Sequence, residues 1–192
     1  MKSIYLVLDM ENDLVAEDGP NGRSPLGAEV QGRGILPKTA TAIAKARTAG
    51  VMIGYVRVGF SPDYRECPTT SIIFAGAKQH GLFKLSSWGT EVHASLKPQE
   101  GDFDIVKHRV SPFYGTSLEP ILRANGIERI VMSGVSTVAV VQAGVRDGHD
   151  RDYRCVVLED CCAAASASAH QAGIATLDRF AEISSSAEIS FD

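Results

Sequence analysis

The stretch Ile4-Tyr5-Leu6-Val7-Leu8-Asp9, close to the start of the chain, decides the fold. Five consecutive apolar residues that end at a carboxylate are typical of a short strand buried on both faces of a parallel sheet. Similar apolar runs recur along the chain, and segments with apolar residues at helical spacing lie between them. Further strands are expected at residues 51–58, 103–106, 129–132, 153–158 and 181–184.

Helical segments separate most of these strands. Residues 35–49 are rich in Ala, Lys and Thr, and Gly50 ends this helix. Other helices are expected at residues 118–125, 137–147 and 166–180. The alternation predicts a doubly wound α/β fold, with a mostly parallel six-stranded sheet of order 3-2-1-4-5-6 and helices on both faces. We interpret residues 1–192 as a single domain, because the length suits one core and no linker or repeat interrupts the chain.

Two segments are predicted to be irregular. Residues 19–34 are rich in Gly and Pro and are expected to form a long loop. Residues 61–87 separate the second and third strands and contain Pro62, Pro68, Gly76 and Gly81. A connection of this length inside a compact domain is usually functional, often a lid, so we expect it to shape the mouth of a site.

Composition and charge exclude several classes of protein. Hydrophobic residues make up 44% and charged residues 22%, as in ordinary globular proteins. The net charge is -4 without a basic block, which gives no electrostatic support for binding nucleic acid or anionic lipid. The longest apolar runs are too short to span a bilayer, and the N-terminal sequence lacks a signal-peptide layout. We therefore expect a cytoplasmic protein with reduced cysteines and no membrane or nucleic-acid partner.

Polar residues at strand ends are the first candidates for a site, because ligands of open α/β sheets bind beyond the carboxyl ends of strands. Asp9 ends the first strand, Lys107 ends the third, and the turn Ser133-Gly134-Val135-Ser136-Thr137 follows the fourth. Each also has a structural explanation, since an Asp there often caps a helix and a Lys is usually solvated. Position alone leaves both interpretations open.

Five blocks of sequence, in order along nearly the whole chain, carry a resemblance to a known superfamily. The first is Leu8-Asp9-Met10-Glu11-Asn12-Asp13-Leu14. The others are Ser87-Trp88-Gly89-Thr90-Glu91, residues 106–118, Gly134-Val135-Ser136-Thr137 and residues 158–163. Together they resemble the isochorismatase-like (cysteine hydrolase) superfamily, whose first block typically reads Asp-Met-Gln-Asn-Asp-Phe. The resemblance implies one hydrolase domain, a small-molecule substrate, no cofactor, and a homo-oligomer, dimer or larger.

The resemblance also implies roles for individual residues. It makes Asp9 and Lys107 catalytic and places a non-proline cis peptide bond at Val135–Ser136. This turn, with Thr137, would aim backbone N–H groups at the substrate, and the following helix N-terminus would add positive potential. Asn12 and Asp13 are expected to hold the loop. Further candidates for the pocket, each with a structural or solvated alternative, are Trp88, Phe113, Tyr114, Arg57 and Arg65.

The chain departs from the superfamily at the nucleophile. Most members carry a Cys six residues after the turn Gly, and Val140 holds that position here. A valine cannot attack a carbonyl group, so a covalent thioester route is in question. Cys155 is interpreted as a buried structural thiol, and Cys161 and Cys162 as residues that follow a strand end without catalytic use. Cys67 lies in the irregular segment 61–87 and could approach the site, although a non-catalytic role is favoured. The Asp-x-His metal motif of nicotinamidases is missing after the second strand, and we expect no metal.

Two functional hypotheses follow. The first is Asp/Lys-assisted, non-covalent hydrolysis of a vinyl ether or C–N bond in a small anionic molecule, similar to true isochorismatases, which have a small residue in place of the Cys. The alternative is a catalytically disabled member, a pseudoenzyme or Cys-replaced variant, that binds a small ligand. Lys107 favours an ionised Asp9, which suits a general base on water, whereas an apolar wall that includes Val140 favours the protonated acid.

Overall fold

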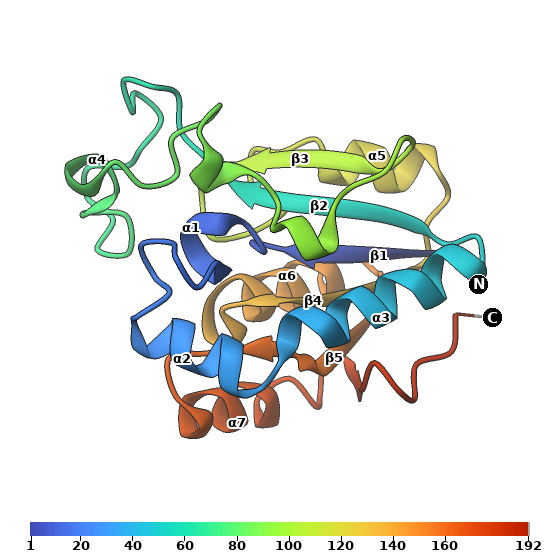
Figure 1. Ribbon diagram of the computed structural model, residues 1–192. Coiled ribbons are helices and arrows are strands. Elements are labelled where there is room, and N and C mark those ends of the chain that lie inside the picture. Colours follow the sequence, from blue (N-terminus) through green and yellow to red (C-terminus); the bar gives the residue numbers. More distant parts are fainter. Residues whose placement is uncertain (192) are drawn as a thin grey trace.

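The computed structural model of the protein describes residues 1–191, and its centre is one parallel sheet (Figure 1). The strand order is β3-β2-β1-β4-β5-β6, and every pairing between neighbours is parallel. The strands are β1 Ser3–Leu8, β2 Met52–Val58, β3 Phe103–Lys107, β4 Arg129–Val135, β5 Arg154–Ala163 and β6 Glu182–Ser184. The predicted fold class and strand order are confirmed.

Helices cover both faces of this sheet. They are α1 Asn12–Val15, α2 Pro25–Gly32, α3 Ile35–Thr48, α4 Ala77–His80, α5 Leu118–Ala124, α6 Gln142–His149 and α7 Ala167–Ala175, with short 3-10 turns at Trp88–Thr90 and Ala94–Leu96. Figure 1 shows α3 on one face and α5 and α6 on the other. Within residues 1–191, no helix combines the length and apolarity needed to cross a membrane.

The buried strand β1 explains why its sequence is continuously apolar. Tyr5 and Val7 pack into the core that contains α3, whereas Ile4, Leu6 and Leu8 pack into the core that contains α5 and α6. Alternate residues of a strand point to opposite faces, so a strand covered on both faces needs an apolar side chain at every position. β1 is a central strand of the sheet, between β2 and β4. Asp9, the residue after β1, therefore lies near the middle of the edge that the carboxyl ends of the strands form.

Several expected boundaries were wrong. Residues 19–34 are not a continuous loop, because α2 begins at Pro25, and the side chain of Ser24 accepts a hydrogen bond of 3.1 Å from the Gly27 N–H. A Ser before a Pro is a helix-start signal that the Gly content obscured. Strand β5 continues to Ala163 instead of ending at 158, so Cys161 and Cys162 lie within it. The last helix ends at Ala175, earlier than expected.

The connection between β2 and β3 projects from the body of the protein as an irregular segment with the short helix α4 (Figure 1). Its side chains form a small core of their own, in which Phe60 and Phe74 meet edge to face with ring centroids 5.5 Å apart. Backbone hydrogen bonds from Phe60 to Phe83 (2.7 Å) and from Leu85 to Phe60 (2.9 Å) close its base. The excursion, residues 61–87, is thus packed against the carboxyl ends of the strands.

Candidate active site

A cavity of about 290 Å³ opens at the carboxyl ends of the first four strands. At the ~30 Å³ that a water molecule occupies in the liquid, this volume holds roughly ten non-hydrogen atoms. Its walls come from the strand ends, from α1 and α2, from the excursion, and from the turn after β4. The lining residues are Asp9, Leu14, Asn21, Leu26, Val58, Ile73, Phe74, Leu82, Phe83, Lys107, Val110, Val135, Ser136, Ala139 and Val140.

A buried ion pair lies on the wall of this cavity. Lys107 Nζ is 3.0 Å from Asp9 Oδ2 and also donates a 2.9 Å hydrogen bond to the carbonyl of Arg109. Asp9 is 5% exposed and Lys107 only 2% exposed. The other carboxylate oxygen, Asp9 Oδ1, has no hydrogen-bond partner. The fold therefore brings these two predicted residues together and leaves one buried carboxylate oxygen without a hydrogen-bond partner.

The local backbone fixes the direction of Asp9. Its N–H donates a 2.8 Å hydrogen bond to the carbonyl of Val56, which continues the sheet pairing, but its φ of 54° turns the chain out of the strand. Burial raises the pKa of the Asp9 carboxyl above its usual range, and the ammonium of Lys107 opposes this shift. Both influences on Asp9 that the sequence left open are thus present in the site.

The turn after β4 forms the floor of the cavity. The Val135–Ser136 peptide bond is cis, as expected from the resemblance. Gly134 has a φ of 152°, and a Cβ at this position would lie 2.1 Å from the carbonyl oxygen of Leu8. The close approach of the two chains therefore requires glycine. A π-helical turn at Thr137–Val141 then leads into α6 and places Val140 on the cavity wall.

No cysteine lines this cavity in the part of the chain that the structure describes. Cys155, Cys161 and Cys162 are buried in β5, and burial raises the pKa of the Cys155 and Cys162 thiols to about 12. Cys67 lies in the excursion, where its sulfur is 3.8 Å from the carbonyl of Phe74. None of the four thiols therefore takes the place of a nucleophile at Val140.

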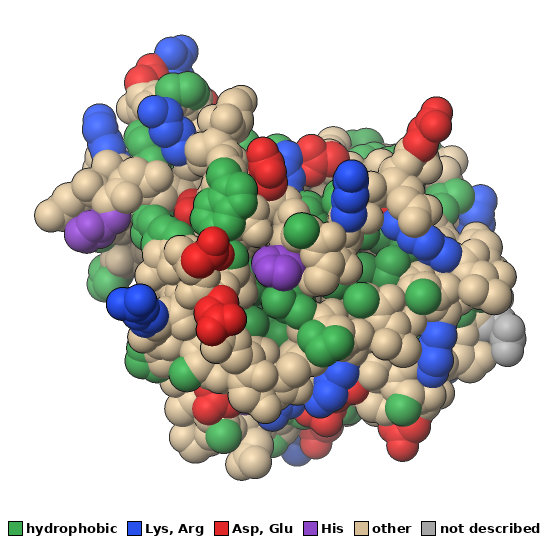
Figure 2. All heavy atoms as spheres, viewed as in Figure 1, with side chains coloured by type: hydrophobic (Ala, Val, Ile, Leu, Met, Phe, Trp, Pro, Cys, Tyr) green, Lys and Arg blue, Asp and Glu red, His purple; other side chains and the backbone are tan. Residues whose placement is uncertain are grey.

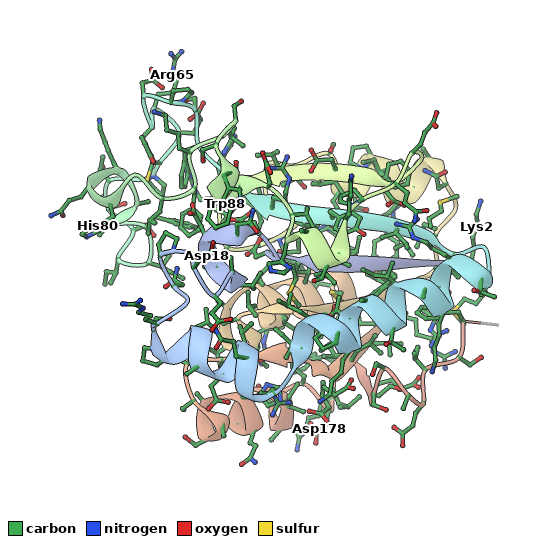
Figure 3. All side chains as sticks on the ribbon, in the orientation of Figure 1. Lys2, Asp18, Arg65, His80, Trp88 and Asp178 are labelled. Atoms are coloured by element: carbon green, nitrogen blue, oxygen red, sulfur yellow. The ribbon has the colours of Figure 1, made fainter. Side chains whose placement is uncertain are left out.

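Two other predicted contacts lie outside the cavity, in a separate groove of about 720 Å³ on the outer surface. Trp88 is 48% exposed there, and Figure 3 places it near Asp18. Arg57 also lines this groove, where it forms two 2.7 Å hydrogen bonds to the carboxylate of Asp104 and one to the carbonyl of Thr90. Its charge is thus engaged away from the Asp9 cavity.

The remaining aromatic and cationic candidates also have other surroundings. Phe113 is buried in the core, stacked on Tyr153, whereas Tyr114 is 68% exposed. Arg65 forms an ion pair with Asp63 and points into solvent from the excursion (Figure 3).

Thr137 does not line the cavity either. Its side chain is completely buried, and Thr137 Oγ1 shares a 2.8 Å hydrogen bond with His170 Nδ1. Its position at the start of the π-helical turn makes it a support of that turn.

Two polar residues after Asp9 hold the surrounding loops, as the sequence predicts. The Asn12 side-chain amide donates a 2.8 Å hydrogen bond to the carbonyl of Trp88. Asp13 Oδ2 accepts a 2.6 Å hydrogen bond from the Phe83 N–H. Burial raises the pKa of the Asp13 carboxyl, and this hydrogen bond opposes the shift. The segment that carries Asp9 is therefore connected directly to the excursion.

Sequence reasoning missed Glu11, which is completely buried and has no hydrogen-bond partner on either carboxylate oxygen. Burial raises its pKa well above the usual range, and the charge of Asp9 adds to this shift. The opposing cations are Lys107 and Arg57. The sequence did contain an indication of this residue, because the isochorismatase-like superfamily typically has an uncharged Gln at the position of Glu11.

A buried carboxylate and ammonium at the ends of parallel strands, in a small enclosed cavity, are the arrangement of an α/β enzyme site. The family model described as the isochorismatase domain matches residues 3–188. A ureidoacrylate amidohydrolase, RutB of Klebsiella pneumoniae subsp. pneumoniae, is 31% identical over an alignment of length 192 that covers 93% of this chain and 81% of that protein. The chain therefore belongs to the isochorismatase family of hydrolases.

Two solved structures extend the comparison. An isochorismatase family protein from Desulfovibrio vulgaris has a TM-score of 0.85 and 26% identity, with 97% of this chain and 95% of that chain covered. The N-carbamoylsarcosine amidase from Thermoplasma acidophilum has a TM-score of 0.76 and 27% identity, with 99% of each chain covered. In residues 1–191, no three His, Cys, Asp or Glu side chains are grouped to hold a metal ion; a metal-free site stays a prediction.

Proposed function

We propose that this protein hydrolyses a C–N bond of a small amide or ureide without a covalent intermediate. One observation carries the proposal: Asp9 and Lys107, paired at 3.0 Å, both line a cavity in which Val140 holds the nucleophile position, and Asp9 Oδ1 has no hydrogen-bond partner. The names of two relatives support the bond type, since one is an amidohydrolase of ureidoacrylate and the other an amidase of N-carbamoylsarcosine.

In this mechanism Asp9 is a general base. The ammonium of Lys107, 3.0 Å away, keeps a carboxylate available, and Asp9 Oδ1 removes a proton from water as its oxygen attacks the substrate carbonyl carbon. Backbone N–H groups of the turn at residues 136–140 bind the oxyanion that forms. The C–N bond then breaks, and the Asp9 carboxylic acid returns the proton to the leaving nitrogen. Water thus attacks the carbonyl carbon directly, and no thioester to a cysteine forms.

A second candidate reaction is vinyl-ether hydrolysis with Asp9 as the proton donor. The raised pKa of the Asp9 carboxyl favours this reaction, because a protonated Asp9 could protonate the double bond before water adds. Both reactions need the carboxyl group of Asp9. C–N hydrolysis uses it ionised in the resting enzyme, whereas vinyl-ether hydrolysis uses it protonated.

The test is a turnover assay on a panel of small amides, ureides and vinyl ethers. Asp9→Asn should lower kcat by about 10²–10⁴-fold, the range of general acid–base catalysis. Asp178→Asn is the matched control, because Asp178 is exposed and far from the cavity (Figure 3). Turnover that survives Asp9→Asn would refute the assignment. A parent that is inactive on the whole panel, with turnover by Val140→Cys, would instead identify a disabled cysteine hydrolase that binds ligand.

We also infer a cytoplasmic protein, from the sequence features given above, and a homo-oligomer, a dimer or larger, from the resemblance to the family. Sedimentation velocity should give a mass of at least two chains. A single-chain mass at micromolar concentration would contradict the inference.

A further inference from the structure

Most of the residues that line the cavity next to Asp9 are apolar. Its polar side chains are Asp9, Asn21, Lys107 and Ser136, and every other lining residue is apolar. Val140 holds the position at which most members of the superfamily carry a Cys, so this part of the wall is apolar as well. A cavity of this composition stabilises a ligand mainly by removing apolar surface from water.

The charges around the cavity do not favour an anionic ligand. Lys107 is the one cation among the lining residues in the part of the chain that the structure describes, and it is already bonded to Asp9 and to the carbonyl of Arg109. A substrate carboxylate would therefore be buried beside Asp9 without a free cation, which is a costly arrangement.

The arginines of this region are engaged elsewhere. Arg57 is paired with Asp104 outside the cavity, and Arg109 donates to the carbonyls of Glu66 (2.9 Å) and His108 (2.6 Å). In Figure 2, the Lys and Arg side chains of the projecting segment stand on its outer surface. Among residues 1–191 no Arg lines the cavity, so no guanidinium there can form the paired hydrogen bonds that recognise a carboxylate.

One wall of the cavity comes from the excursion. Ile73 and Phe74 precede α4, Leu82 and Phe83 follow it, and all four line the cavity. Phe83 is held in place by the hydrogen bond from its N–H to Asp13. Ile73 remains 60% exposed although it lines the cavity, so it lies at the mouth and has apolar surface still to bury. A branched aliphatic or aromatic group fits against this wall.

We propose that the substrate is an uncharged amide or ureide of roughly ten non-hydrogen atoms that carries a branched aliphatic or aromatic group against Ile73 and Phe74. The inference rests on the proposed C–N hydrolysis and names its substrate class. It replaces the anionic molecule expected from the sequence, because the cavity offers apolar contact and no unpaired cation.

Matched pairs of compounds test the inference, since an isopropyl group and a carboxylate have nearly the same shape. The pairs are 4-methylpentanamide with succinamate, and isobutylurea with N-carbamoylglycine. We expect kcat/KM to be at least about 100-fold higher for the uncharged member of a pair, because the charged member loses hydration without a partner. Equal or faster turnover of the charged members would overturn the inference and leave C–N hydrolysis intact.

Substitutions at two neighbouring residues test whether the wall formed by the excursion determines the preference for uncharged substrates. Ile73→Arg puts a cation at the cavity mouth and should reduce the preference for the uncharged member at least about tenfold, because it supplies the missing partner for a carboxylate. Ile72→Arg adds the same charge at a side chain that is 95% exposed and does not line the cavity, and should leave the preference unchanged. An equal effect of both variants would contradict the assignment of the wall.

Binding measurements separate this inference from the proposed reaction. Calorimetric titration of the parent with the same four compounds reports affinity whether or not a bond is cleaved. Absence of turnover on all four would refute C–N hydrolysis of these compounds, and tighter binding of the uncharged members would still support the substrate class. Tighter binding of the charged members would overturn it.

Discussion

Replacing Glu11 by Gln should flatten the pH dependence of the free energy of unfolding. Glu11 is completely buried without a hydrogen-bond partner, and its pKa in the folded protein lies well above the ordinary value of 4.5. A raised pKa means that the folded state holds the proton more tightly than the unfolded state. Stability that the protonated carboxyl provides is therefore full below about pH 4.5 and falls as the pH rises toward the folded-state pKa.

The magnitude follows from one proton. The free energy of unfolding of the parent should lose about 1.4 kcal/mol per pH unit relative to Glu11→Gln, for as long as folded Glu11 keeps its proton. The Gln amide itself has unmet hydrogen bonds, which cost about 1–3 kcal/mol at every pH. The difference in the free energy of unfolding at a single pH is therefore not informative. The change of this difference with pH tests the prediction.

Urea unfolding of both proteins at four pH values between 5 and 8 measures this slope. Glu100→Gln is the matched control, because Glu100 is exposed and the same substitution there should leave the dependence of the parent unchanged. Parallel curves for the parent and Glu11→Gln would refute the reasoning, since they would mean that Glu11 has the same proton occupancy in the folded and unfolded states.

Three further predictions concern the site and its supports. Lys107→Met should lower the free energy of unfolding by about 3–5 kcal/mol, because it leaves Asp9 buried without its cation; recovery in the Asp9→Asn/Lys107→Met double variant, measured by urea unfolding, would confirm the cause. Gly134→Ala should lower Tm, with a cost of about 1–3 kcal/mol or more, because its Cβ would meet the carbonyl of Leu8 at 2.1 Å; an unchanged Tm would contradict the close approach. Iodoacetamide should modify the partly exposed Cys67 before Cys155, which is buried with a pKa raised to about 12; mass spectrometry of native protein gives the order, and earlier labelling of Cys155 would contradict it.

The fold and the central ion pair were accessible from the sequence because they follow from local rules. Continuous apolar runs that alternate with helical segments predict a parallel sheet covered on both faces, the strand-end rule places Asp9 and Lys107 among the candidates, and the family resemblance then gives them their roles. These two residues are far apart in the sequence, and the strand order brings β1 and β3 close enough for a 3.0 Å contact.

The misses have physical reasons too. Arg57 precedes a strand end by one residue, and because side chains alternate along a strand it faces Asp104 and not the cavity. The backbone carbonyl of Trp88 accepts a hydrogen bond from the Asn12 side chain. The sequence does not show whether a residue acts through its backbone or through its side chain. Helix α2 depended on a cap at Ser24 within a Gly-rich stretch. The apolar character of the cavity was hidden, because its wall is assembled from the irregular excursion.

The hydrogen bond between Asp13 and the Phe83 N–H has a consequence for engineering. The excursion is the segment to exchange between relatives when a different substrate range is wanted, because it forms one wall of the cavity and contributes little to the sheet. A transplanted segment must present a backbone N–H to the carboxylate four residues after Asp9, whatever side chains it brings. Chimaeras that ignore this docking point should lose the alignment of the new wall with the reacting groups, and those that keep it can vary the wall freely.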